Sequence, residues 1–313
     1  MKQSITTTIK SAARKGGLLT AAGTLLLCAA AIVLVLAGCD NGNGPPESEP
    51  DIDFGHDSYR ELTVSSLDEW NEAKATISDG GNNKNYVINV SETVTGITGD
   101  SYATFGSGSG IKVSLRGAEK FLVLGSTGTL IKVPAGHTVI VRGVSLEGRG
   151  SDEGYENNSP LVCVEEGGTF TLADGKIGGN NANVDGSGVQ VQSGGTFTMS
   201  GGTIWENTTG YSGGGVYVSN SGTFTMSGGD IKRNTAGYSG GGVCVYGTFT
   251  KTGGTIYGKD ADASEKNTAD AGEDTKGHAV FVPDTDHYRD TTAGPSVNLS
   301  VVAGAVSGAG WNQ

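Results

Sequence analysis

A repeat of 27 residues runs through the middle of this chain and constrains its fold more than any other feature. Residues 193–220 match residues 221–247 nearly position for position, and Thr-Phe-Thr-Met-Ser-Gly-Gly occurs at 196–202 and again at 223–229. A unit of this length cannot bury its own apolar face, so neighbouring units must stack. Four series of positions keep the period: Phe170, Phe197 and Phe224; Ile177, Ile204 and Ile231; Asn180, Asn207 and Asn234; Cys163, Gln190, Tyr217 and Cys244.

Each copy contains three short strand-like pieces separated by glycine-rich turns. In one copy they are Thr196–Met199, Gly202–Ile204 and Val216–Val218. Strand alternation places Phe197 inside and Tyr217 outside. Propeller blades need about 40–50 residues and leucine-rich repeats need a helix, so the pattern predicts an all-β fold, a parallel β-helix of about seven coils. Like residues of successive coils then form ladders.

The two ends of the chain fit this fold. Ser66 and Glu69 make a capping-box pattern before apolar residues at helical spacing, which predicts a short amphipathic helix over the open N-terminal end. A polar segment at 259–276 is predicted to be an inserted loop. Further predicted strands are Tyr86–Val90, Ile111–Leu115 and Phe121–Leu124, with a closing coil at Ala279–Val282 and Val297–Val302.

The N-terminal segment has the features of a lipoprotein signal. A basic leader precedes an uncharged stretch, 16–38, which ends in Leu-Ala-Gly-Cys39 and resembles the bacterial lipobox. The resemblance implies cleavage of a signal peptide, 1–38, and lipidation of Cys39, and several acyl chains give stable anchoring. Residues 39–58 read as a flexible tether before the β-helix domain, 59–313. An uncleaved membrane helix is the alternative.

The formal net charge of the chain is −12 at pH 7. Binding to phosphate needs a basic surface, so the charge argues against a nucleic acid partner. The 54 glycines keep no three-residue period, which excludes collagen.

The repeat units resemble those of a known family. GGTFTMSGGTIxxN and GGGVYV, which recur over 161–282, look like the units of right-handed, pectin-lyase-like β-helix proteins of bacterial surfaces, and more loosely like polymorphic outer-membrane protein repeats. The resemblance implies a right-handed coil. The family's fold is shared by polysaccharide lyases, hydrolases and adhesins, so fold alone does not decide function.

No catalytic constellation is visible in the repeats. A lyase would need clustered outward carboxylates for calcium, and a hydrolase would need facing aspartates, whereas Asp174 and Asp230 stand alone, two coils apart. We therefore expect no catalytic residue, metal site or cofactor. Acidic residues gather only on the predicted loop, as a solvated or a calcium-binding segment: Asp260, Asp262, Glu265, Asp270, Glu273 and Asp274. Cys163 and Cys244, three coils apart, are too distant for a disulfide, which predicts two free thiols.

Outward aromatic residues are the candidate binding residues. Trp205 and Tyr257 follow inward isoleucines on one face, about two coils apart, and Tyr217 stands on another face. Aromatic rings stack on the apolar faces of sugars, so these three are possible glycan-binding residues. The alternative is that they are ordinary strand residues.

Threonines also align from coil to coil. Thr196 and Thr198 flank Phe197, and the same Thr-x-Thr pattern recurs in three other copies. The arrangement resembles the threonine arrays of β-helical ice-binding proteins, although Met199 and Lys251 beside it are expected to make the surface uneven.

The sequence thus predicts a lipid-anchored cell-envelope β-helix protein, a non-catalytic surface or adhesin-like interaction module. The expected partners are a membrane, through the anchor, and a polysaccharide or a ligand on a host or neighbouring surface. We expect the outer membrane or cell surface as its location. The alternative function is a carbohydrate-active β-helix enzyme of the polysaccharide lyase or hydrolase type.

Overall fold

The computed structural model describes residues 54, 57–150, 156–269, 276–283, 287–302, 305–308 and 311. The predicted signal peptide, Cys39 and most of the predicted tether lie outside these residues. Phe54, from the end of the tether, is buried, and its ring centroid lies 5.7 Å from that of Tyr59. None of the helices in the described ranges is long and apolar enough to cross a membrane.

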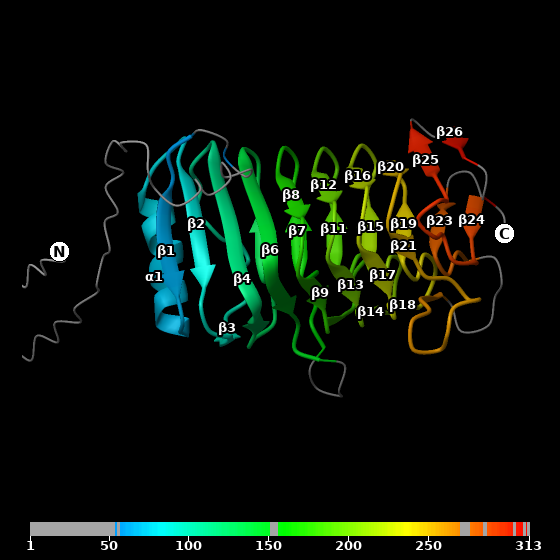
Figure 1. The fold of residues 1–313 in the computed structure, drawn as a ribbon, viewed down its shortest axis with the longest axis horizontal. Helices are drawn as coiled ribbons and strands as arrows, with labels where there is room; N and C mark the ends of the chain where they lie inside the picture. Colours follow the sequence, from blue (N-terminus) through cyan, green and yellow to red (C-terminus); the bar gives the residue numbers. More distant parts are fainter. Residues whose placement is uncertain are drawn as a thin grey trace, which may run out of the picture. The chain divides into compact units, whose positions relative to one another are not determined.

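The repeats form a parallel β-solenoid of about seven turns, as the period predicted (Figure 1). Each regular coil contributes strands to separate ladders. The first ladder contains β1 (Arg60–Val64), β2 (Asn85–Val90), β4 (Ile111–Leu124), β6 (His137–Glu147), β8 (Thr169–Leu172), β12 (Thr196–Met199), β16 (Thr223–Met226) and β20 (Thr248–Lys251). The second contains β3 (Val94–Ile97), β9 (Lys176–Gly178), β13 (Thr203–Trp205), β17 (Asp230–Lys232) and β21 (Thr255–Ile256). The long strands β4 and β6 continue from the first ladder into the second, so the predicted strands 111–115 and 121–124 are one strand with a register shift.

A third and a fourth ladder complete the coils. The third contains β5 (Ile131–Val133), β7 (Val162–Val164), β11 (Val189–Val191), β15 (Val216–Val218), β19 (Val243–Val245) and β23 (Val280–Val282). The fourth, of two-residue strands, was not predicted, and contains β10 (Asn181–Ala182), β14 (Thr208–Thr209), β18 (Thr235–Ala236) and β22 (Thr268–Ala269). Strand β22 lies within the predicted loop 259–276, so that segment is not wholly without strand structure.

The register between coils is the one that the sequence period predicts. Phe197 pairs with Phe224 in parallel strands, and their ring centroids lie 4.7 Å apart with planes 7° from parallel. The stack continues to Phe170 at 5.6 Å and to Phe249 at 5.2 Å. All four phenylalanines are buried, and together with the aligned isoleucines and valines they form one continuous core along the solenoid.

A buried asparagine ladder supports one corner of the coils. The Oδ1 atom of Asn234 accepts hydrogen bonds from the backbone N–H of Asn207 at 3.1 Å and from its Nδ2 at 3.0 Å. The Nδ2 of Asn207 also donates to the carbonyl of Ile177 at 3.2 Å. The predicted ladder is longer by one member at each end, because Asn157 and Asn267 join it. Backbone groups that the turn would leave unpaired in the interior are thereby satisfied.

The N-terminal end of the solenoid is covered by the predicted helix, α1 (Leu67–Asp79). The side chain of Ser66 accepts a hydrogen bond from the N–H of Glu69, as an N-cap residue does. The Glu69 carboxylate accepts from Ser65, one residue before the cap. Trp70, Ala73 and Ile77 are buried, so the helix shields the unpaired end of the core.

The C-terminal end is closed differently from the prediction, by strands that reverse direction. Strands β24 (His287–Arg289), β25 (Leu299–Val302) and β26 (Ala305–Ser307) pair antiparallel. Lys251 is fully buried in the inward column that holds Met226 in the coil before it. Its ammonium group donates to the carbonyls of Gly294 at 2.8 Å and Val297 at 2.9 Å.

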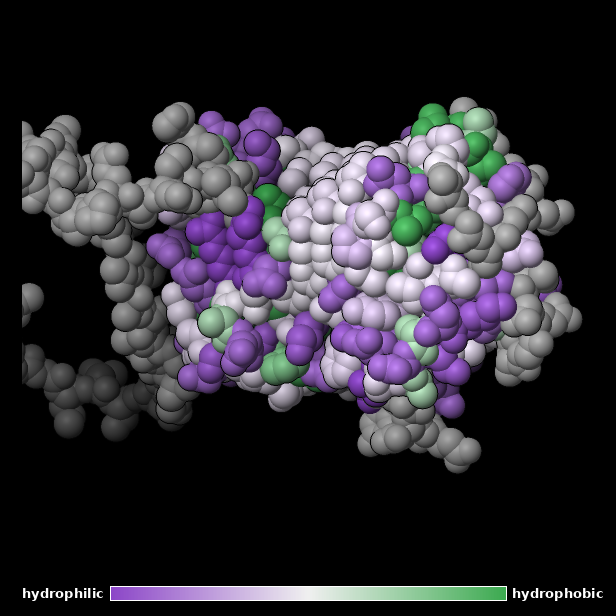
Figure 2. Space-filling model, turned by 45° about the vertical axis from the view of Figure 1, so that its right-hand side comes forward, coloured by the Kyte–Doolittle hydropathy of each residue, from purple (hydrophilic) through white to green (hydrophobic). Residues whose placement is uncertain are grey.

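The threonines form two outward columns on the first ladder, which we call the threonine columns. They consist of Thr169, Thr171, Thr196, Thr198, Thr223, Thr225, Thr248 and Thr250. The expectation that Met199 and Lys251 make this surface uneven is wrong, since both are fully buried on the inward side. Figure 2 shows one face of the molecule with a broad region of neutral hydropathy over the middle coils and hydrophilic side chains toward the ends.

Candidate functional site

Trp205 and Tyr257 lie in one outward column, as predicted. Trp205 pairs with Gly178 of the preceding coil and with Lys232 of the following one. Tyr257 follows Lys232 in the column, because its N–H donates to the carbonyl of Ile231 at 3.0 Å. We call Gly178, Trp205, Lys232 and Tyr257 the tryptophan column.

Cationic side chains lie over both aromatic rings of the tryptophan column. Lys176 Nζ and Arg233 Cζ each lie 5.6 Å from the centroid of the Trp205 ring, and Lys232 Nζ lies 5.6 Å from that of Tyr257. The indole also packs against Gly178, where any Cβ atom would collide with it. A sugar ring would have to displace these groups in order to stack on the covered faces.

Two of the cations around the tryptophan column form ion pairs. Arg233 forms an ion pair with Glu206, and the Lys232 ammonium group lies 3.3 Å from the Glu265 carboxylate. Burial, with smaller contributions from Asp230 and Glu265, raises the pKa of Tyr257. The phenol is therefore neutral, and charges of both signs lie beside the column rather than charges of a single sign.

Tyr217 lies on a different face, beside a second tyrosine. It points outward from β15, between the buried Val216 and Val218, and is half-buried. Its ring centroid lies 5.6 Å from that of Tyr246, with the planes at 50°, and Tyr246 is 36% exposed. Tyr246 was not predicted, because the repeat has no tyrosine at that position. Because successive side chains of a strand point to opposite faces, the inward Val245 predicts that the side chain of Tyr246 points outward.

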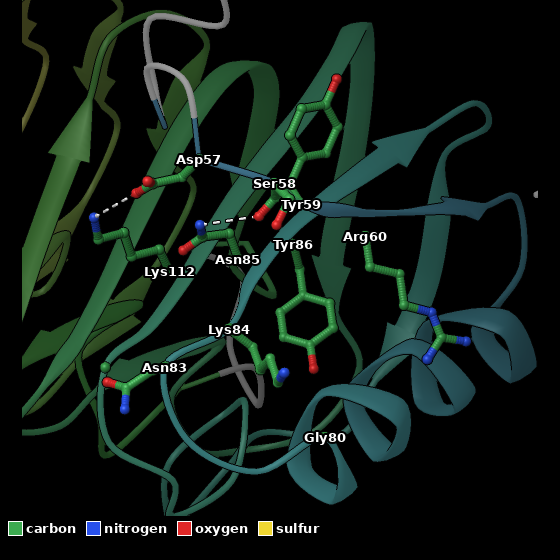
Figure 3. A pocket seen from close by; sticks show the side chains of 11 residues that line it. Asp57, Ser58, Tyr59, Arg60, Gly80, Asn83, Lys84, Asn85, Tyr86 and Lys112 are labelled. Carbon is green, nitrogen blue, oxygen red and sulfur yellow. Dashed lines mark hydrogen bonds and ion pairs between the residues drawn. The ribbon is translucent and has the colours of Figure 1, made fainter. Parts of the chain in front are cut away.

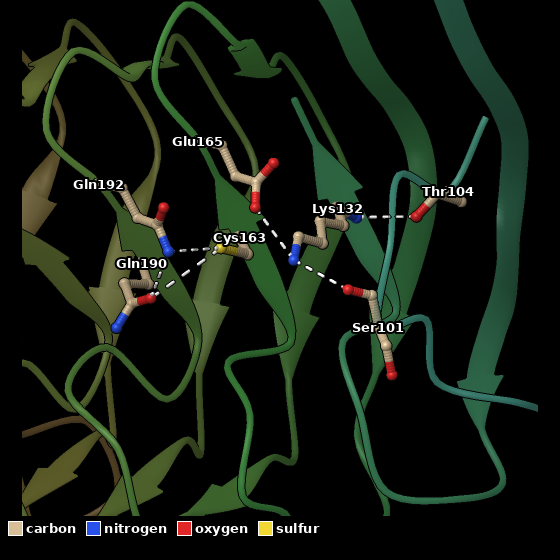
Figure 4. Close-up of polar contacts among 7 residues, drawn as sticks. All are labelled: Ser101, Thr104, Lys132, Cys163, Glu165, Gln190 and Gln192. Atoms are coloured by element: carbon tan, nitrogen blue, oxygen red, sulfur yellow. Dashed lines mark hydrogen bonds and ion pairs between the residues drawn. The ribbon is translucent and has the colours of Figure 1, made fainter. Parts of the chain in front are cut away.

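Glutamines extend this face toward the N-terminal end. Gln190 precedes Tyr217 in the same column, and Gln192 lies beside it. Gln192 Nε2 donates to Gln190 Oε1 and to Cys163 Sγ, both at 3.4 Å, and Gln190 Nε2 donates to the carbonyl of Asp185 at 2.9 Å (Figure 4). The two amides therefore hold one another in fixed positions.

An ion pair bounds the glutamines. Figure 4 shows Lys132 and Glu165 from neighbouring coils turned toward one another, with Nζ and Oε1 3.0 Å apart. The Lys132 ammonium group also donates to the carbonyl of Ser101 at 3.0 Å. The positive and negative charges at this boundary thus balance.

At the other end the column reaches Phe281, whose register position follows Cys244. Phe281 is half-buried and points outward between the buried Val280 and Val282. Tyr288 pairs with it across the antiparallel strand β24. We call the outward residues of this ladder the tyrosine face: Gln190, Gln192, Tyr217, Tyr246 and Phe281.

The two thiols next to the tyrosine face are unreactive by position. Cys163 and Cys244 are free, as predicted, and although they occupy outward register positions both are buried. Burial raises the pKa of Cys163 to about 11 and that of Cys244 to about 12. Since the thiolate is the nucleophile, neither supports covalent chemistry at neutral pH.

The acidic loop is described only in part. Asp270, Glu273 and Asp274 lie outside the described residues. Asp260 accepts a hydrogen bond from the Thr292 hydroxyl at 2.8 Å, and Glu265 is engaged with Lys232. Within the part of the chain that the structure describes, no group of three histidine, cysteine or acidic side chains is arranged to hold a metal ion.

A shallow pocket of about 770 Å³ lies at the N-terminal end of the solenoid (Figure 3). Arg60, Lys84 and Lys112 line it with Asp57, which lies 4.0 Å from Lys112. These charged side chains are largely solvated, so the pocket offers an anion little beyond weak surface attraction.

Comparison of the chain with known protein families, curated proteins and solved structures found no match.

Proposed function

We propose that the protein is a non-catalytic interaction module of the bacterial cell envelope, lipid-anchored through Cys39, whose outward side chains bind a polysaccharide or another surface ligand. One observation carries the binding role, namely the aromatic pairs on the outside of successive coils. Tyr217 lies against Tyr246, and Tyr211 lies 6.0 Å from Tyr238, with exposed fractions of 46% and 61% for the second pair.

The free-energy cost of exposing aromatic rings to water supports a binding role for these pairs. Aromatic rings gain free energy when buried, and the inside of each coil is already filled by phenylalanine, isoleucine and valine. Tyrosine rings, with apolar faces and one polar end, suit amphipathic ligands such as sugars.

Anchoring and binding are tested separately. Metabolic labelling with a radioactive fatty acid should label the full-length protein and not Cys39→Ala, and cell fractionation should place only the labelled protein in the envelope. In gels that contain a polysaccharide ligand, the purified protein should migrate more slowly than in gels without it. It should release no new reducing ends or unsaturated products from the polysaccharide. Turnover of any polysaccharide would refute the non-catalytic proposal in favour of a lyase or hydrolase.

Ice binding is a second candidate function, favoured by the threonine columns. The eight threonines are spaced about 4.8 Å apart from coil to coil and about 6.8 Å apart along a strand. The two columns that they form are uncharged. Their branched side chains are stiff, and each hydroxyl both donates and accepts hydrogen bonds. Thermal hysteresis of the purified protein, lost in Thr198→Lys, would support this function, and its absence in the unaltered protein would exclude it.

A further inference from the structure

A pocket of about 450 Å³ lies along the corner that the asparagine ladder supports, between the second and the fourth ladder. One wall is formed by the residues that directly precede the ladder asparagines, which we call the corner column: Gly179, Glu206, Arg233 and Lys266. The other wall is formed by Thr208, Thr235 and Thr268 of the fourth ladder. These threonines pair in register two residues beyond the corner column, which fixes the alignment of both walls.

Charges of opposite sign occupy opposite ends of the pocket. Glu147 lies at the N-terminal end, because it pairs with Gly178 of the next coil, and Glu206 lies one coil beyond that glycine. Arg233 and Lys266 follow in the next two coils. At about 4.8 Å per coil, the midpoint of the two acidic positions lies about 12 Å from the midpoint of the two basic positions.

These charges are only partly compensated within the protein. Arg233 forms an ion pair with Glu206, whereas in the described part of the chain the side chains of Glu147 and Lys266 make no ion pair or hydrogen bond. Glu147 is half-buried. Its burial and the nearby Glu206 raise the pKa of its carboxyl group, against a smaller opposite effect of Lys176. A positive group between the two glutamates would stabilise both carboxylates.

The two central residues of the corner column have an unusual backbone conformation. Glu206 and Arg233 have φ angles of 52° and 59°, a region that L-residues rarely adopt and glycine adopts readily. Gly179 has a φ of 66° at the equivalent position of the preceding coil. The chain therefore keeps two charged side chains where glycine would fit without strain. The asparagine ladder fixes the backbone beside them, so this wall is rigid before a ligand binds.

The opposite wall offers hydrogen-bonding groups at regular intervals. Thr208, Thr235 and Thr268 are half-buried, and their hydroxyl groups make no hydrogen bond to the described part of the chain. Each hydroxyl can both donate and accept. Three successive coils can thus bind the polar groups of an extended ligand that lies parallel to the axis of the solenoid.

The order of the charges selects the class of ligand. An anionic ligand would be repelled by the two glutamates, a cationic one would be repelled by Arg233 and Lys266, and a neutral one would leave both ends uncompensated. A dipolar ligand with charges about 12 Å apart compensates both ends, and an extended peptide of three to four residues has this length at about 3.3–3.6 Å per residue. Single amino acids and zwitterionic lipid headgroups carry their charges too close together.

We propose that the pocket at the corner column binds a short peptide with a free amino group and a free carboxylate. The amino group lies between Glu147 and Glu206, and the carboxylate lies at Arg233 and Lys266. The threonines of the opposite wall bind the peptide groups between these ends. The site is separate from the aromatic pairs, so this inference goes beyond the proposed function and does not depend on polysaccharide binding.

Isothermal titration calorimetry of the full-length protein in detergent micelles tests the ligand class. The probe is tetra-alanine with free termini, for which we expect saturable binding. N-acetylated tetra-alanine and tetra-alanine amide each lack one terminal charge and should bind about tenfold more weakly, because a hydrogen bond to a charged group is lost. Free alanine should not bind at the same concentrations.

Two variants test the site and the direction of the peptide. Glu147→Gln should weaken the binding of tetra-alanine about threefold and leave that of the acetylated peptide unchanged. Lys266→Met should weaken the binding of tetra-alanine to the same extent and leave that of the amide unchanged. Neither side chain makes an ion pair in the described part of the chain, so both variants should fold. Glu92→Gln, the control, removes an exposed carboxylate 3.0 Å from Lys120 and should not change peptide binding.

The contrary results are equally distinct. Absence of saturable tetra-alanine binding, or equal affinity for the free and the capped peptides, would overturn the inference. Unchanged binding in both Glu147→Gln and Lys266→Met would place the peptide outside the pocket and overturn the site. None of these results bears on the proposed function, which depends on lipidation of Cys39 and on polysaccharide binding by the aromatic pairs.

Discussion

Replacing Asn207 by alanine tests the buried asparagine ladder that supports one corner of the coils. Asn207 is fully buried, and its Oδ1 atom accepts the backbone N–H of Asn180 at 3.3 Å. Its Nδ2 atom donates to Ile177 and Asn234. The alanine variant would leave the Asn180 N–H without this acceptor and remove two further hydrogen bonds.

The expected loss follows from these contacts. A buried donor left unsatisfied costs about 1–3 kcal/mol, and each other lost hydrogen bond about 1 kcal/mol. Asn207→Ala should therefore lower the free energy of unfolding by about 3–5 kcal/mol. With an m-value of about 3 kcal/mol per molar urea, the midpoint of unfolding should fall by about 1–1.7 M.

The assay is equilibrium unfolding in urea, followed by circular dichroism. Asn183→Ala is the matched control, since Asn183 is exposed and, within the described residues, its side chain makes no hydrogen bond. The control should change stability by no more than about 0.5 kcal/mol. Equal effects of the two substitutions would refute the argument that the ladder stabilises the coils.

Three further predictions concern the core, the C-terminal end and the thiols. Phe197→Ala removes the middle of the phenylalanine stack and should cost about 3–5 kcal/mol, whereas Thr198→Ala on the outside should cost less than about 1 kcal/mol in thermal unfolding. Burial lowers the pKa of Lys251 from its ordinary 10.5 to about 8, so the folded state binds fewer protons than the unfolded state between these values. The free energy of unfolding should rise by up to about 3 kcal/mol between pH 8 and pH 10.5. If the same rise is measured in Lys251→Met, a group other than Lys251 causes it. Cys163 and Cys244 should resist alkylation at pH 8 in the native protein and react in urea; labelling without denaturant would contradict their burial.

The sequence period predicts the regular coils because side chains of one kind repeat at one spacing. Phe197 and Phe224 have equivalent surroundings, so their stacking follows from a constant coil length. Asn157 and Asn267 escaped prediction because they lie 23 and 33 residues from their ladder neighbours. Loops of different length enter the coils there, and a fixed period cannot follow them.

Surface properties were less predictable than core properties. The repeat predicts the outward position of Trp205, but the cations over its ring come from Lys176, a diagonal neighbour in β9, and from Arg233, which lies one position beyond β17. Tyr246 was missed because it belongs to one coil only. A repeat shows which positions are shared, whereas binding surfaces depend on the positions where copies differ.

Lys251 also has a consequence for how such a chain could change in length. Duplicating one 27-residue unit before this residue would insert another coil, with its phenylalanine, isoleucine and asparagine in register with those of its neighbours. If a unit were duplicated after Lys251, the ammonium group of Lys251 would lie where the core of the added coil must pack. That ammonium group is already bound to the carbonyls of Gly294 and Val297. We expect natural variants of different length to gain or lose units only upstream of Lys251, with both end structures kept.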